Sequence, residues 1–240
     1  MMRSRLGLLG LCAVVLGMMA FGMTAHGEEG AQWLVLDEDG TALDTATLPA
    51  GLQWTVEKND VSLLTTLFKV ALKVLCTASS PMGAGLVAEG KLKLGFKAKF
   101  TGCQTFLNGS ATPSASCVPH SSGAPAGTIE TTPLKGLIVL HTGKVKLVLV
   151  EPEMGETMAT LLMSELCPLG ESIPIKGKLY LKDSENMLEA HEVVHLVEQG
   201  PLTDLWVLSK TAEHVVTLDG SAEVFLTGLH LDRPWGGMPA

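Results

Sequence analysis

Aromatic residues and basic charge are both scarce in this sequence. Phe, Trp and Tyr make up 5% of its 240 residues, with a single tyrosine, and 17 Lys and Arg stand against 25 Asp and Glu. The formal net charge of −8 at pH 7 argues against nucleic acid or an anionic membrane surface as the main partner. The shortage of aromatic rings argues against a stacking platform for sugars.

Several catalytic motifs are absent too. The sequence contains no G-x-S-x-G nucleophile motif and no Gly-rich phosphate loop of the Walker or dinucleotide-binding type. No two of its cysteines stand at the C-x2-C or C-x4-C spacing of a thiolate zinc site. These absences argue against serine hydrolases, nucleotide-binding enzymes and proteins with cysteine-ligated zinc.

The first 27 residues have the anatomy of a secretory signal peptide. Arg3 and Arg5 precede an uncharged stretch over residues 6–24, and Ala25-His26-Gly27 provides small residues at both positions that determine cleavage. Cleavage near Gly27 would leave residues 28–240, in which no stretch is long and apolar enough to span a bilayer. We therefore expect an exported protein, either secreted or located in the periplasm or cell envelope.

Four cysteines remain in the mature chain: Cys76, Cys103, Cys117 and Cys167. An even number in an exported protein predicts two disulfides, and the sequence alone leaves three connectivities open. Cys103 and Cys117 flank Asn108-Gly109-Ser110, a strong turn signal between two candidate strands. We therefore expect Cys103 to pair with Cys117, which leaves Cys76 to pair with Cys167.

Alternation of apolar and polar residues predicts an all-β fold. Residues 91–100 alternate most regularly, with apolar side chains at every even position and lysines at most odd ones, which is typical of a strand with one solvated face. We predict an antiparallel β-sandwich or barrel with little helix in the mature chain. It is organised either as one exported domain over residues 28–240 or as two lobes divided at the loop over residues 110–127.

Short strands at regular spacing are expected beyond residue 128. The candidates are residues 137–141, 144–150, 159–166, 173–182, 205–208, 214–218 and 221–226. Thr142-Gly143 and Asp219-Gly220 predict tight hairpins within this series. Nearer the N-terminus, residues 69–77 alternate as a strand that follows a turn of helix or a loop. Residues 233–237 are expected to form a C-terminal tail.

The strongest candidate for chemistry is the H-E-x-x-H sequence over residues 191–195. On a helix this spacing places His191 and His195 on one face as zinc ligands, with Glu192 as the base for a zinc-bound water. A helix over residues 185–199 is compatible with a Ser184 cap.

Two observations oppose that interpretation. The β-branched residues at the centre of the segment favour a strand. A third ligand is also missing, because Glu198 and Pro201 stand where the metzincin extension requires Gly and His. Whether this segment forms a helix or a strand is left open by the sequence.

The second half of the chain resembles a group of exported bacterial proteins. The stretches that carry the resemblance are residues 100–103 with the 107–109 turn, residues 136–141, residues 195–203, and residues 217–222 with the strand that follows. The likeness covers most of the mature chain, and its motifs are turns and strands. The group is β-rich and has no assigned reaction, so the resemblance implies export and a β fold and adds no catalytic residue.

Together these patterns favour a non-enzymatic exported protein that binds a small ligand or a protein partner, or has a structural role at the envelope, without a cofactor. The alternative is a zinc-dependent hydrolase that uses His191, Glu192 and His195. A third option is a calcium-assisted adhesive module at residues 37–39, an acidic turn that lacks the spaced ligands of an EF-hand loop.

Overall fold

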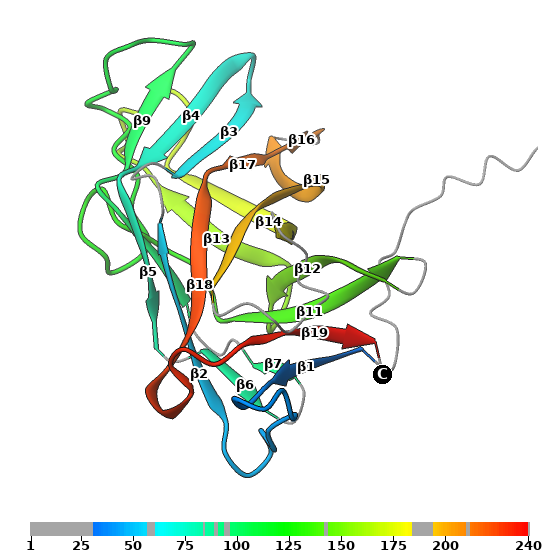
Figure 1. Ribbon diagram of the computed structural model, residues 1–240. Coiled ribbons are helices and arrows are strands. Elements are labelled where there is room, and N and C mark those ends of the chain that lie inside the picture. The colour runs from blue at the N-terminus through cyan, green and yellow to red at the C-terminus, as the bar shows by residue number, and fades with distance from the viewer. Residues whose placement is uncertain are drawn as a thin grey trace, which may run out of the picture.

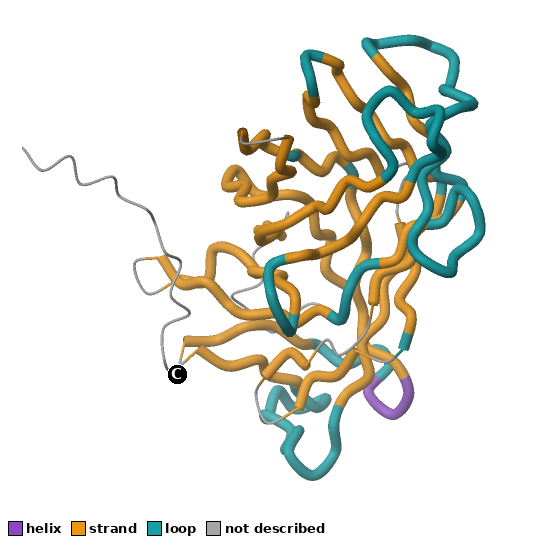
Figure 2. The backbone as a smooth tube through the Cα atoms, turned by 180° about the vertical axis from the view of Figure 1, so that it is seen from behind, coloured by secondary structure: helices purple, strands orange, loops and turns teal. Residues whose placement is uncertain are grey.

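The computed structural model describes residues 31–56, 61–83, 85–88, 91–93, 97–141, 144–183, 194–209 and 212–239. This part of the chain is built from antiparallel strands, which confirms the all-β prediction (Figure 1). Its one helical segment is a 3-10 turn over Gly228–His230, the short purple piece in Figure 2. No helix in this part is long and apolar enough to cross a membrane. The expected signal peptide and its cleavage point at Gly27 lie outside the described residues.

The strands are β1 (Ala31–Val35), β2 (Ala50–Val56), β3 (Val61–Leu67), β4 (Val70–Cys76), β5 (Ala78–Met82), β6 (Gly85–Ala88), β7 (Lys91–Lys93), β8 (Lys97–Thr101), β9 (Gln104–Leu107), β10 (Ile129–Glu130), β11 (Leu134–His141), β12 (Lys144–Pro152), β13 (Thr157–Leu162), β14 (Ser172–Asp183), β15 (Val194–Ser209), β16 (Ala212–Val215), β17 (Thr217–Asp219), β18 (Ser221–Thr227) and β19 (Trp235–Pro239).

The largest sheet has the strand order β13-β14-β12-β11-β7-β6-β2-β18-β15-β16. An additional pairing between β14 and β15 brings together strands from near the two ends of this order. Strands from both sides of the loop over residues 110–127 take part in it. That loop is therefore not a boundary between two sheets.

Three smaller sheets complete the fold: β17-β3-β4-β9, β10-β8-β5 and β1-β19. Each contributes to one shared hydrophobic core, for example through Leu72 of β4, Ile129 of β10 and Trp33 of β1, which belong to the same buried cluster as Val148 of β12. The apolar members of the alternating strands therefore point to a common interior, as the period of two requires.

The hairpin of β3 and β4 differs from the sequence expectation. The strand from residue 69 is confirmed as β4, but the preceding segment is strand β3 and not a helical turn or loop. Phe68 and Lys69 form the turn with φ angles of 51° and 67°. Positive φ at both central residues suits a tight hairpin, although Asn and Gly are the usual residues there. Because the turn lacks those residues, local sequence gave no hairpin signal.

One expected strand and one expected hairpin are each divided between two sheets. The alternating residues 91–100 contribute β7 to the ten-stranded sheet and β8 to the three-stranded sheet. The Asp219-Gly220 hairpin prediction is wrong, since β17 pairs with β3 whereas β18 pairs with β15 and β2. Gly220 has a φ of 141°. The dipeptide that allows a hairpin here redirects the chain from one sheet to another.

The β11–β12 hairpin is present as expected. The two strands pair from Leu134 with Pro152 to His141 with Lys144. Their connection, Thr142-Gly143, lies outside the described residues. The predicted C-terminal tail, in contrast, is strand β19, which pairs with β1 over its whole length. Trp235 is 1% exposed, and its ring centroid lies 5.6 Å from that of Trp33.

All four cysteines form disulfides, but the expected pairing is wrong. The bonds join Cys76 to Cys103 and Cys117 to Cys167. Strands β4 and β9 are neighbours, which places Cys76 beside Cys103. After the Asn108 turn the loop stays close to β9 through a hydrogen bond from the Ser114 N–H to the Thr105 carbonyl, and then lies against β13, where His120 bridges to Leu162. Cys117 lies in the part of the loop near β13 and is bonded to Cys167, which follows that strand.

Candidate functional site

The H-E-x-x-H segment is described only at its C-terminal end. Strand β15 begins at Val194, and His195 pairs with Val224 of β18. The possible helix over residues 185–199 is therefore wrong from Val194 onward. His191 and Glu192 lie outside the described residues. Within the described part no group of three His, Cys, Asp or Glu side chains is placed to hold a metal. A metal at His191 and His195 remains a hypothesis.

In the acidic turn at residues 37–39, the side chains of Asp37 and Glu38 already make hydrogen bonds and an ion pair. Asp37 Oδ1 accepts hydrogen bonds from the backbone N–H groups of Asp39 at 2.9 Å and Thr41 at 2.8 Å. Glu38 pairs with Arg233 at 3.2 Å. These contacts close the turn and attach it to the segment before β19, which is a structural role for the cluster.

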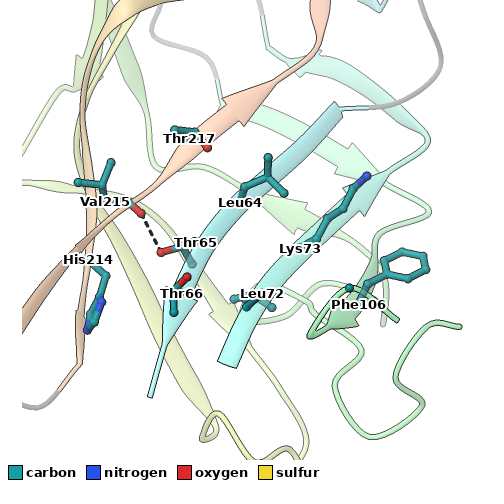
Figure 3. Close-up of a pocket in the computed structure, with 11 residues that line it drawn as sticks. Leu64, Thr65, Thr66, Leu72, Lys73, Phe106, His214, Val215 and Thr217 are labelled. Atoms are coloured by element: carbon teal, nitrogen blue, oxygen red, sulfur yellow. Dashed lines mark hydrogen bonds between the residues drawn. The ribbon is translucent and has the colours of Figure 1, made fainter. Parts of the chain in front are cut away.

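The described surface contains a groove of about 620 Å³ between the four-stranded sheet and β16 (Figure 3). Such a volume is within the range of about 300–1,000 Å³ that small-ligand sites occupy. Its lining residues come from β3, β4, β9, β16, β17 and the turn after β9. They are Leu64, Thr65, Thr66, Ala71, Leu72, Lys73, Phe106, Gly109, His214, Val215 and Thr217.

The floor of the groove is a row of directly opposed residues on four neighbouring strands. Phe106 of β9 pairs with Lys73 of β4, Lys73 with Leu64 of β3, and Leu64 with Thr217 of β17. Directly opposed residues in antiparallel strands project to the same side of the sheet. The other side carries the buried Leu72 and Val74, so the row occupies the outer face.

Strand β16 forms the side wall. Val215 is 63% exposed, and its backbone carbonyl accepts a hydrogen bond of 2.8 Å from the buried Thr65 hydroxyl. Figure 3 shows this bond between the wall and the floor, with His214 and Val215 on one side and Lys73 and Phe106 on the other. The hydrogen bond attaches the side wall to β3, one of the strands of the floor.

The Asn108-Gly109 turn closes one end, as the sequence predicted a turn there. The Asn108 backbone N–H donates to the Ala71 carbonyl at 2.8 Å, and the Ala71 N–H donates to Asn108 Oδ1 at 3.1 Å. Gly109 has a φ of 72°, a conformation that suits glycine. One end of the groove is thus formed by a turn that two hydrogen bonds attach to the backbone of Ala71.

The electrostatics of the groove differ from those of the whole chain. Acidic residues outnumber basic ones in the sequence, yet none of the described residues that line the groove carries a carboxylate. Lys73 is exposed and makes no ion pair with any described residue. Its ammonium therefore lies among aliphatic, aromatic, hydroxyl and imidazole side chains.

A second charged cluster lies on the ten-stranded sheet. Lys135 and Lys178 donate to Glu151 at 3.0 and 3.1 Å from the strands on either side of β12. Burial alone would raise the pKa of Glu151, but the hydrogen bonds from both lysines outweigh burial and hold this pKa below its usual value. The two ion pairs join three neighbouring strands, and each of the three charged groups has a partner within the cluster.

Sequence reasoning missed the groove. The polar and apolar residues of β3 and β4 alternate, but their partner β16 lies about 150 residues further on, as the Thr65–Val215 bond shows. No family of known proteins, no curated protein and no solved structure matches this chain. The resemblance to exported β-rich proteins therefore remains a hypothesis.

Proposed function

We propose that this chain is an exported, non-enzymatic binding protein that holds a small amphipathic ligand in the groove between the four-stranded sheet and β16. The observation that carries the proposal is a groove of about 620 Å³ whose described lining combines exposed apolar side chains with a lysine that makes no ion pair with a described residue. Pockets for small molecules combine an apolar wall with a few polar groups in this way. The two disulfides and the leader-like residues 1–27 support export, because disulfides persist in oxidising compartments.

The arrangement supports binding better than catalysis. A hydroxyl nucleophile needs an adjacent general base, and a base needs a group that orients it. No hydrogen bond joins His214 to Thr65, Thr66 or Thr217, although all four line the groove. The Thr65 hydroxyl is already donated to a backbone carbonyl. The groove thus offers contact surface and a charge, without a coupled pair of reacting groups.

The test is a fluorescence titration of the mature chain with N-phenyl-1-naphthylamine, a neutral apolar probe. We expect saturable binding of one probe per chain. A Val215→Glu variant introduces a charge into the wall and should weaken probe binding at least tenfold. The matched control is Leu229→Glu, at an 80% exposed apolar residue of the 3-10 turn, which should bind as the parent does. Equal affinities of all three proteins, or no saturable binding to the parent, would refute the proposed function.

A further inference from the structure

We propose that the ligand of the groove is a single-chain monoanion of the fatty-carboxylate class, with its carboxylate at Lys73 and its hydrocarbon chain across β3 and β17 toward Val215. This inference rests on the proposed function and specifies its ligand. It follows from the order of side chains along the floor of the groove, where Phe106 and Leu64 flank Lys73 and the row continues across β3 to β17.

The headgroup is assigned by charge complementarity. The Lys73 ammonium makes no ion pair with a described residue, and the described lining contributes no acidic residue that would repel an anion. A hydrogen bond between an ammonium and a carboxylate is about twice as strong as a neutral one. Nor do the described lining residues include an arginine, the residue whose planar fork favours bidentate or doubly charged groups. One lysine therefore matches one negative charge.

The length of the ligand's hydrocarbon chain follows from the spacing between the strands of the floor. From Lys73 of β4 the row passes Leu64 of β3 and ends at Thr217 of β17. Neighbouring strands lie about 4.8 Å apart, so this path is roughly 10 Å long. Leu64 is 37% exposed and Val215 63% exposed, which leaves apolar surface available on both sides of that path. A hydrocarbon chain laid across the strands would cover this surface.

The ring of Phe106 stands on the other side of Lys73. It is directly opposite Lys73 and only partly buried. Apolar neighbours on both sides lower the local dielectric around an ammonium and so strengthen its attraction for an anion. A cationic or neutral headgroup would gain nothing from this position, and a cation would be repelled.

The experiment measures displacement of N-phenyl-1-naphthylamine by decanoate, 1-decanol and decyltrimethylammonium at pH 8. For each protein variant the readout is the ratio of the decanol dissociation constant to the decanoate dissociation constant. We expect decanoate to bind at least tenfold more tightly than decanol to the parent chain. Lengthening the chain from octanoate to decanoate should strengthen binding about fourfold per methylene group.

Lys73→Gln should lower the ratio to near one. The control is Lys97→Gln, at an exposed lysine of β8 in the three-stranded sheet, which should keep the parent ratio. Equal displacement by decanoate and decanol, an unchanged ratio in Lys73→Gln, or displacement by decyltrimethylammonium as good as that by decanoate would overturn the headgroup assignment. Any of these results, with probe binding still sensitive to Val215→Glu, would leave the proposed function standing. If Val215→Glu did not weaken probe binding, both the headgroup assignment and the proposed function would be refuted.

Discussion

The hydroxyl of Thr65 donates a 2.8 Å hydrogen bond to the backbone carbonyl of Val215, and this bond joins the sheet that forms the floor of the groove to the sheet that contributes its side wall. Thr65 belongs to β3 and faces the core, whereas Val215 ends the edge strand β16. The groove therefore depends on a contact between an internal strand of one sheet and the last strand of another.

Thr65→Val should widen or loosen the groove. The substitution keeps the shape of the side chain but removes the donor to the Val215 carbonyl, and we expect a loss of about 1–2 kcal/mol in the free energy of unfolding. Probe affinity should fall in parallel. Urea denaturation and probe titration measure the two effects. Thr66→Val, at the neighbouring exposed position, should change the stability by less than about 0.5 kcal/mol, and an equal loss in both variants would count against the role of this bond.

Glu151→Gln should destabilise the protein at neutral pH and alter its acid unfolding. The pKa of Glu151 is lowered in the folded state, so its contribution is present above the unfolded value of 4.5 and is lost as the pH falls through the folded value. We expect a loss of about 1 kcal/mol at pH 7, since both lysine partners are partly exposed. The difference between parent and variant should vanish in strong acid.

Urea denaturation at a series of pH values measures this effect. The control is Glu165→Gln, at an exposed residue that makes no ion pair with a described residue. It should leave both the stability and its pH dependence unchanged. A Glu151 effect of constant size from pH 7 to pH 2 would show that charge is not its origin.

The disulfide pairing predicts the products of tryptic digestion without reduction. Cleavage after Lys73, Lys91, Lys99, Lys135, Lys146 and Lys176 puts Cys76, Cys167 and the pair Cys103 with Cys117 on three separate peptides. Bonds from Cys76 to Cys103 and from Cys117 to Cys167 would link all three peptides into one species by mass spectrometry. A bond between Cys103 and Cys117 would instead release residues 100–135 as a free peptide, and that product would contradict the structure.

Trp235→Ala should strongly destabilise the fold, although this residue lies only five positions before Ala240. Its side chain is almost fully buried and packs against Trp33. Truncation of a buried tryptophan costs about 3–5 kcal/mol. Thermal and urea unfolding would show the loss. Leu231→Ala, at a residue that is 55% exposed in the same region, should cost less than about 1 kcal/mol. Similar stabilities of the two variants would mean that β19 is not part of the cooperative fold.

Metal analysis tests the remaining hydrolase hypothesis. Since His195 lies in a strand, we expect far less than one equivalent of zinc in the purified mature chain. Chelation should leave its melting temperature unchanged. About one equivalent of zinc, lost in both His191→Ala and His195→Ala, would reverse this expectation and favour the hydrolase over the binding protein.

Local sequence was sufficient to predict the secondary structure wherever the periodicity of the side chains alone decides it. The alternating residues of β12 and β14 predicted strands, because a period of two allows one face of a strand to be buried and the other solvated. An even number of cysteines in an exported chain predicted two disulfides. Neither inference requires knowledge of which distant segment lies nearby.

The choice of partners required the tertiary structure. The pairing of β17 with β3, the bond from Cys76 to Cys103, and the burial of Trp235 against Trp33 all join residues far apart in the chain. Many partners are compatible with any one alternating strand, and only simultaneous packing in a common core selects among them. Periodicity and cysteine number were enough to predict an all-β chain with two disulfides. Only the tertiary structure brought β16 beside β3 and so created the groove, because a contact across 150 residues leaves no local pattern.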